Sequence, residues 1–289
     1  MKRALVVVML LALLAPLGGA SAKRIAVPQF DHVVVIVIEN KARKDVIGNP
    51  DAPYFNSLAA KYVTLPRYGG VTHPSLPNYI ALVSGGTQGI HNDCTSCIVS
   101  AKNLADSLER AHLTWKSYAE GLPHRGFTGA TAGLYAKRHV PFLYFRDIVS
   151  KPARLRRVVP LTEFGRDLRA DRLPSFAFVT PNVCHDMHGA SGCPTSDVIA
   201  AGDSWLAANL PPIIQFANAN AGVIFLVWDE PEGGGPLIPF LAIGPTIKPG
   251  YANPTSVTHS ALVNTVERIF GLPILPTVAG APGKAAAEP

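Results

Sequence analysis

Uninterrupted apolar runs alternate along the chain with segments in which apolar residues recur at helical spacing. The run HVVVIVI, which begins at His32, is typical of a strand buried on both faces of a sheet. Runs of the same kind predict strands within residues 63–71, 113–120, 175–182, 221–230 and 236–244. Helical spacing predicts helices within residues 51–62, 76–86, 103–112, 202–217 and 259–270.

This alternation predicts an α/β fold, a three-layer sandwich in which helices cover both faces of a largely parallel central sheet. Residues 121–160 follow neither period, and we interpret them as an insertion or a lid over a site. The small, Pro-punctuated residues 276–289 predict a disordered tail. A single domain is therefore expected over residues 23–275.

Residues 1–22 have the pattern of a secretory signal peptide, with Lys2 and Arg3 before an apolar run and small residues at its end. The alternative is a permanent anchor, but Pro16 interrupts the run, which is short for a bilayer span. No other segment of the sequence is long and apolar enough to cross a membrane. The mature protein is expected to be secreted or to lie in the cell envelope or periplasm, without a transmembrane segment.

The formal net charge of +6 falls to +4 once Lys2 and Arg3 are removed. Basic residues are scattered, apart from the segment KPARLRRVV that begins at Lys151. Such a segment can attract anionic surfaces, but it is more often a solvated loop. The charge therefore predicts no specific nucleic-acid partner.

The four cysteines form two local pairs, Cys94 with Cys97 and Cys184 with Cys193. In an exported protein these pairs predict two short-loop disulfides. The alternative is a zinc site, because one pair has C-x-x-C spacing and histidines lie nearby. The second pair lacks the spacing of a zinc knuckle, which favours the disulfides.

Polar residues follow three of the predicted strands where each strand ends. Glu39 and Asn40 follow the first strand, Asp229 and Glu230 follow another, and a third is followed by His185, Asp186 and His188. In a parallel sheet these ends meet at one edge, where ligands bind. Carboxylates gathered there would repel one another, so we expect a divalent cation between them.

The segment THPSLPNYIALVSG places Ser75 at the start of a predicted helix, between Pro74 and Pro77. A serine here can simply cap the helix. A hydroxyl at a helix N-terminus, where N–H groups and the dipole favour an anion, is also well placed to attack phosphorus.

Six successive segments resemble motifs of the phosphoesterase family that contains bacterial phospholipases C and acid phosphatases, within the alkaline phosphatase-like superfamily. The resemblance runs from about His32 to Pro273 and implies an alkaline phosphatase-like fold. The segments are HVVVIVIEN, THPSLPNYIALVSG, TPNVCHDMH, GDSWLA, VWDE and THSALVNTVERIFGLP.

The resemblance also implies roles for individual residues. Ser75 matches the nucleophile, whose oxygen also reaches the metal. Asn78 matches a donor to a phosphate oxygen, and His185 a general acid near the leaving group. The remaining matches are the metal ligands Glu39, Asn40, Asp229 and Glu230, and the substrate-side residues His73 and Asp186. His188 is a further substrate-side candidate because of its place just past a strand.

Together these observations predict an exported, metal-dependent phosphoesterase that works through a phosphoserine, with a phosphomonoesterase favoured over a phospholipase C or another phosphodiesterase. The substrate is expected to be a small phosphate ester or a phospholipid head group. One divalent ion is expected, which can be Mg, Ca, Mn, Zn or Fe.

Two other functions remain as alternatives. The segment AGDSWL contains the Gly-Asp-Ser of some esterases and offers Ser204 as nucleophile, but no apolar strand precedes it. Asp203 or Ser204 as a helix cap explains the segment better. A phosphate-binding or surface-binding protein without activity would have no use for the complete set of candidate groups.

Overall fold

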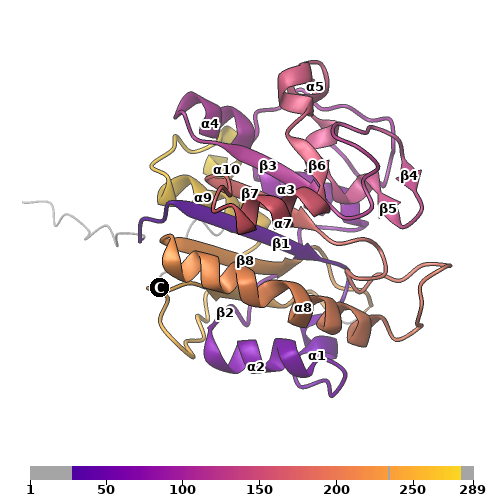
Figure 1. Cartoon of the computed structure of the whole chain (residues 1–289), viewed down its shortest axis with the longest axis vertical. Coiled ribbons are helices and arrows are strands. Elements are labelled where there is room, and N and C mark those ends of the chain that lie inside the picture. Colours follow the sequence, from indigo (N-terminus) through magenta and orange to yellow (C-terminus); the bar gives the residue numbers. More distant parts are fainter. Residues whose placement is uncertain (1–27, 234, 281–289) are drawn as a thin grey trace, which may run out of the picture.

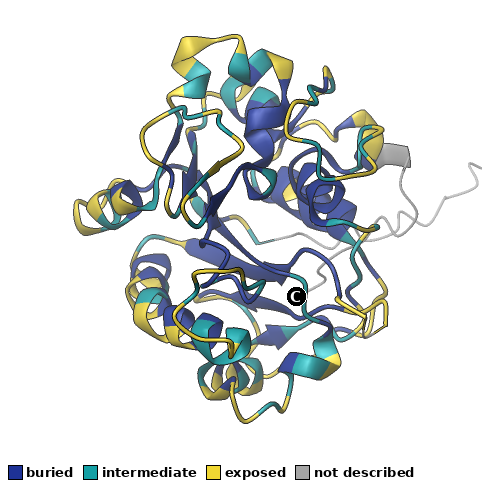
Figure 2. Cartoon of the chain, turned by 90° about the vertical axis from the view of Figure 1, so that its right-hand side faces the viewer, coloured by how far each residue is buried: buried dark blue, intermediate teal, exposed yellow. Residues whose placement is uncertain are grey.

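The computed structural model describes residues 28–233 and 235–280. A mostly parallel sheet of seven strands crosses the molecule, in the order β2-β9-β8-β1-β7-β3-β6 (Figure 1). Its strands are buried over nearly their whole length, and exposed residues are concentrated on the outer helices and loops (Figure 2). The signal peptide predicted for residues 1–22 lies outside the described residues.

The six predicted strands are confirmed, β6 joins them as a seventh, and five adjacent strands of the sheet run parallel. The bounds are β1 (His32–Ile38), β2 (Val63–Thr64), β3 (Trp115–Ala119), β6 (Val158–Pro160), β7 (Phe176–Thr180), β8 (Gly222–Trp228) and β9 (Phe240–Ile243). Strand β1 pairs in parallel with β7 and β8, whereas β9 is antiparallel to β8 and to β2. The apolar run of β1 is explained by its central place in the sheet.

Helices cover both faces of the sheet, as predicted. Successive residues of a strand point to opposite faces. On β7, Phe178 contacts Tyr79 of α3, whereas Val179 lines the space between α7 and α8. The helices on the two faces include α2 (Pro53–Lys61), α3 (Ser75–Ser84), α4 (Leu104–Arg110), α7 (Leu161–Arg169), α8 (Val198–Ala219) and α9 (His259–Ile269), and α1 (Arg43–Val46) follows β1.

Residues 121–160 are more regular than the sequence predicted. They contain the hairpin strands β4 (Thr131–Ala132) and β5 (Tyr135–Ala136), the 3-10 turns η1 (Lys137–His139) and η2 (Pro141–Tyr144), α5 (Arg146–Val149), α6 (Pro152–Leu155) and the edge strand β6. Their aromatic residues pack inward: Phe142, Tyr144 and Phe145 are fully buried. Residues 135–145 are thus part of the core, whereas residues 123–134 are exposed or half-buried.

The predicted disordered tail, residues 276–289, begins with a helix. Residues Pro276–Gly280 form α10, and Val278 is buried where it packs against Gly85. Within the described part of the chain, no helix combines the length and apolar character that a bilayer crossing needs.

Both predicted disulfides are present. Cys94 pairs with Cys97, and Cys184 pairs with Cys193. All four cysteines are used in this way, so they offer no thiolates to the zinc site considered as the alternative.

Candidate functional site

Acidic residues meet at the carboxyl edge of the sheet, as the sequence predicted. In the register of β1 and β8, Ile38 lies opposite Trp228, so Glu39 and Asp229 extend from neighbouring strands. Asp186 lies in the loop after β7, and its backbone oxygen accepts from the N–H of Glu39 at 2.6 Å. Glu120, at the end of β3, was missed although the same rule of strand ends identifies it.

Ser75 is the first residue of α3 and is buried against this edge, with 3% of its surface exposed. Its hydroxyl lies 2.9 Å from Oε2 of Glu39 and 3.1 Å from Oε1 of Glu230. Asp93 accepts from the N–H of Leu76 at 2.9 Å and so occupies a free donor of the helix start. The hydroxyl is therefore held among carboxylates and does not cap its own helix.

Asn78 shapes the turn before Ser75. Its amide nitrogen donates to the backbone oxygens of Thr72 at 2.7 Å and Pro74 at 3.2 Å, and its oxygen accepts from the N–H groups of Val71 and Thr72. Donation to a phosphate oxygen, which the resemblance implied, would require one of these bonds to break. In the structure Asn78 holds the turn that positions Ser75.

Asn40 and Asp229 are joined directly, because the N–H of Asn40 donates to Oδ1 of Asp229 at 3.0 Å. On the other side, the backbone oxygen of Asp229 lies 2.6 Å from Nε2 of His259. Lys41 contacts Oδ1 of Asn40 at 3.2 Å and Oε2 of Glu232 at 2.5 Å. The predicted ligand pairs are thus brought together and fixed by backbone contacts.

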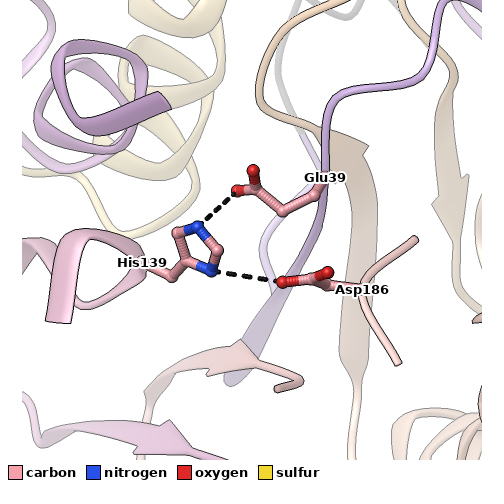
Figure 3. Close-up of side chains that lie close together, drawn as sticks. All are labelled: Glu39, His139 and Asp186. Carbon is pink, nitrogen blue, oxygen red and sulfur yellow. Dashed lines mark ion pairs between the residues drawn. The ribbon is translucent and has the colours of Figure 1, made fainter. Parts of the chain in front are cut away.

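His139 lies between two of the acids and was not identified from the sequence. Its Nε2 is 3.4 Å from Oε1 of Glu39 and its Nδ1 is 3.1 Å from Oδ2 of Asp186 (Figure 3). The ring stacks on Tyr79, with centroids 5.1 Å apart. His139 comes from the turn η1, in a segment without a periodic pattern, so no sequence signal indicated it. His139, Glu39 and Asp186 together could hold a metal ion. Asp186, which was predicted on the substrate side, is therefore also a candidate metal ligand.

Burial dominates the electrostatics of this group. It raises the pKa of Glu39 and that of Asp229, and Glu39 and Glu230 raise the pKa of Asp229 further by repulsion. Burial also raises the pKa of Asp186 to about 7 and lowers that of His139 to about 4. Such shifts mark ionisable groups enclosed without a full set of partners.

Five buried atoms of the site make no hydrogen bond of good geometry; four of them lie in the ion pairs of His139 and His73, and Oδ2 of Asp229 has no such contact. The five are Oε1 of Glu39, Nε2 of His139, Oδ2 of Asp186, Oδ2 of Asp229 and Oε2 of Glu230. Buried polar atoms are nearly always paired in folded proteins. Four of the five are carboxylate oxygens, the donors that hard divalent cations prefer. The chemistry of this donor set therefore fits a divalent cation.

The other predicted histidines take different positions. His73 is exposed and forms an ion pair with Glu230. Glu230 in turn contacts the hydroxyl of Ser75 through its other carboxylate oxygen. His185 is 2.9 Å from both carboxylate oxygens of Glu120. His188 donates its backbone N–H to Oδ1 of Asp186 at 2.8 Å, which places it on the rim of the group.

The esterase alternative finds no support in the geometry. Ser204 is exposed within the long helix α8, away from the strand-to-helix turn that an esterase serine needs. Asp203 accepts from the N–H groups of Tyr54 at 2.9 Å and Phe55 at 2.7 Å. The predicted cap of its own helix is therefore wrong, because α8 already begins at Val198 with Asp197 as its cap; Asp203 instead binds the first turn of α2.

Residues 48–273 match the sequence profile of the family described as the Phosphoesterase family. The chain belongs to this family. The matched range includes Ser75, Asp186, Asp229 and Glu230, whereas Glu39 and Asn40 precede it and enter the site through their contacts.

Several relatives of the chain are named as phosphatases. A phosphatidylinositol-3-phosphatase of Mycobacterium tuberculosis is 38% identical over 250 residues, which cover 86% of this chain and 79% of that protein. Acid phosphatases of Aspergillus niger and Aspergillus fumigatus are 31% and 28% identical and align with 85% of this chain. The chain spans only 60% and 56% of the length of these two fungal relatives.

Solved structures share the fold that the sequence predicted. A protein of the alkaline phosphatase superfamily from Vibrio parahaemolyticus superposes with a TM-score of 0.63, at 12% identity, over 86% of this chain and 69% of that one. The lipoteichoic acid synthase LtaP of Listeria monocytogenes gives 0.61, at 9% identity, over 88% and 75%. The fold is therefore alkaline phosphatase-like, and family membership makes the protein a phosphoric ester hydrolase.

Proposed function

We propose that the protein is an exported phosphomonoesterase that requires a divalent metal ion and uses Ser75 as its nucleophile. The observation that carries this proposal is the buried Ser75 hydroxyl, held by Glu39 and Glu230 at the edge where the buried acids meet. The phosphatase names of the relatives favour a monoester substrate. A small phosphate ester or a phospholipid head group fits this substrate class.

The residues that would hold the metal ion are those that surround Ser75. The predicted ligands are Glu39, Asn40, Ser75, Asp229 and Glu230, and the structure adds His139 and Asp186 as candidates beside Glu39. A bound divalent ion supplies positive charge that stabilises a serine alkoxide and the phosphoryl oxygens. Mostly oxygen donors favour Mg, Ca or Mn, while the imidazole of His139 also suits Zn or Fe.

Ser75 then carries out the first half of the reaction. Its oxygen attacks phosphorus, the bond from phosphorus to the ester oxygen breaks, and the hydroxyl proton passes to Glu39 or Glu230, which already contact the hydroxyl. Water hydrolyses the resulting phosphoserine in the second half. The start of α3 adds backbone dipoles that favour negative charge beside Ser75.

His185 is the proposed acid that protonates the departing alcohol. The carboxylate of Glu120 accepts from its Nδ1 and fixes the orientation of the ring. His73 is the alternative, because its ion pair with Glu230 brings it nearer to Ser75. The two assignments predict different effects of the leaving group.

Replacing His185 with asparagine is expected to slow poor leaving groups selectively. We expect kcat for phenyl phosphate to fall by roughly 100-fold and kcat for p-nitrophenyl phosphate by less than about 10-fold, because a good leaving group needs no proton. The exposed His112 provides the control, His112→Asn, which should change neither rate. If His73→Asn shows the selective pattern and His185→Asn does not, the acid is His73.

The substrate class is tested by paired chromogenic esters. Purified protein should hydrolyse p-nitrophenyl phosphate with a kcat/KM at least about 10-fold above that for bis-p-nitrophenyl phosphate or p-nitrophenylphosphorylcholine. A preference for either diester would instead identify a phosphodiesterase or a phospholipase C.

Export is supported by two independent features. Residues 1–22 have the pattern of a signal peptide, and both cysteine pairs form disulfides, which persist in oxidising compartments. Both features fit a secreted, cell-envelope or periplasmic enzyme.

A further inference from the structure

The turn η1 brings a cation to the site that neither the family match nor the sequence identified. It carries Arg138 directly before His139. The turn is tied to the Cys94–Cys97 loop, because the buried Lys137 donates from Nζ to the backbone oxygen of Thr95 at 2.7 Å. Lys137 thereby fixes the base of Arg138 relative to the start of α3.

Arg138 contacts one residue on the side of the nucleophile, Asp93, and one on the side of Asp186, His188. Its Nε is 3.7 Å from Oδ2 of Asp93, whose other oxygen accepts from the N–H of Leu76, the residue after Ser75. One terminal nitrogen of the guanidinium is 3.4 Å from Nε2 of His188, and the N–H of His188 donates to Asp186. The guanidinium therefore belongs to the ring of groups that surrounds the buried acids.

The contacts of Arg138 are too loose to occupy its donors. Arg125, by comparison, binds both carboxylate oxygens of Glu163, at 2.7 and 2.5 Å. Arg138 makes one contact of 3.7 Å with a carboxylate and one of 3.4 Å with a ring nitrogen of His188, and its side chain is 25% exposed. Several of its five N–H groups remain available to a ligand.

The neighbouring cation differs in this respect. Lys41 lies at the same edge, but its ammonium is held by Glu232 at 2.5 Å and by Asn40. A planar guanidinium presents a fork that matches two oxygens of a phosphate, and its charge persists at every physiological pH. A phosphate monoester carries a second negative charge near neutral pH, whereas a diester carries one.

We propose that Arg138 binds the non-bridging oxygens of the phosphoryl group at Ser75 and selects monoesters over diesters. This inference rests on the proposed function and deepens it. In a diester, one of these oxygens bears a second alkyl group, so the fork loses both an acceptor and a charge. The segment 121–160 then has a role in the site, because it contributes Arg138 as a specificity residue and His139 as a buried histidine.

The test compares Arg138→Gln and Arg138→Lys with Arg146→Gln, an exposed arginine whose side chain contacts Ser100. Arg138→Gln should lower kcat/KM for p-nitrophenyl phosphate by roughly 100-fold and that for bis-p-nitrophenyl phosphate by less than about 5-fold. Arg138→Lys should fall between wild type and Arg138→Gln, because it keeps the charge without the fork. Arg146→Gln should match wild type.

A second readout does not depend on turnover. Inorganic phosphate binding, measured by calorimetry on the metal-loaded protein, should weaken in Arg138→Gln by at least about 10-fold and stay unchanged in Arg146→Gln. Equal losses on both esters, or unchanged phosphate affinity, would show that Arg138 is structural and overturn the proposal. Wild-type protein that binds phosphate through Arg138 but hydrolyses no monoester would contradict the proposed function alone.

Discussion

Ser75→Ala is expected to lower kcat/KM for a phosphate monoester by at least about 1,000-fold, because the substitution removes the oxygen that attacks phosphorus. The hydroxyl lies 2.9 Å from Glu39 and 3.1 Å from Glu230, so its removal leaves the acids in place without the group they orient. Steady-state kinetics with p-nitrophenyl phosphate measure the loss, and thermal unfolding confirms that the variant folds.

Ser204→Ala is the matched control for this result. Ser204 is exposed on α8, and its replacement should leave kcat/KM within about 2-fold of wild type, because surface substitutions away from a site have little effect. Full activity in Ser75→Ala together with a large loss in Ser204→Ala would return the protein to the esterase alternative.

Removal of the metal ion is expected to have the second largest effect. Chelation should reduce monoester hydrolysis to less than about 1% of the starting rate, and a divalent cation added back should restore it. The same treatment should lower the Tm, because Glu39, Asp229 and Glu230 then remain buried together without a counter-charge. Titration with Mg²⁺, Mn²⁺, Ca²⁺ and Zn²⁺ would identify the preferred ion from the Tm and from the rate.

A variant separates the proposed site from cations bound elsewhere. Asp229→Asn should remove most of the rise in Tm that the cation produces, whereas Asp51→Asn, at an exposed position, should retain it. If chelated protein keeps its rate and its Tm, the buried carboxylates of Glu39, Asp229 and Glu230 do not form a metal site.

Much of the fold could be predicted because its signals are local. The continuous apolar run of β1 and the helical spacing of α9 each reflect burial of that same segment. The strand-end rule then predicted that Glu39, Asp229 and Asp186 meet, since parallel register alone brings them to one edge. These inferences needed no knowledge of long-range packing.

What the sequence did not reveal depends on long-range packing. His139 and Arg138 reach the site because Lys137 is tied to Thr95, a contact between residues 42 positions apart. Asn78 was assigned a phosphate contact from its motif, but the structure uses its amide for the turn at Thr72 and Pro74. Such side-chain partners follow from the folded arrangement and leave no period in the sequence.

The central claim is that Ser75 becomes phosphorylated during turnover, and the stereochemistry at phosphorus tests it most directly. A phosphorothioate monoester made chiral with oxygen isotopes would be hydrolysed in isotopically labelled water by the metal-loaded enzyme. Two successive in-line displacements, one by Ser75 and one by water, predict overall retention of configuration. Inversion would mean that water attacks the substrate directly and that Ser75 is not the nucleophile.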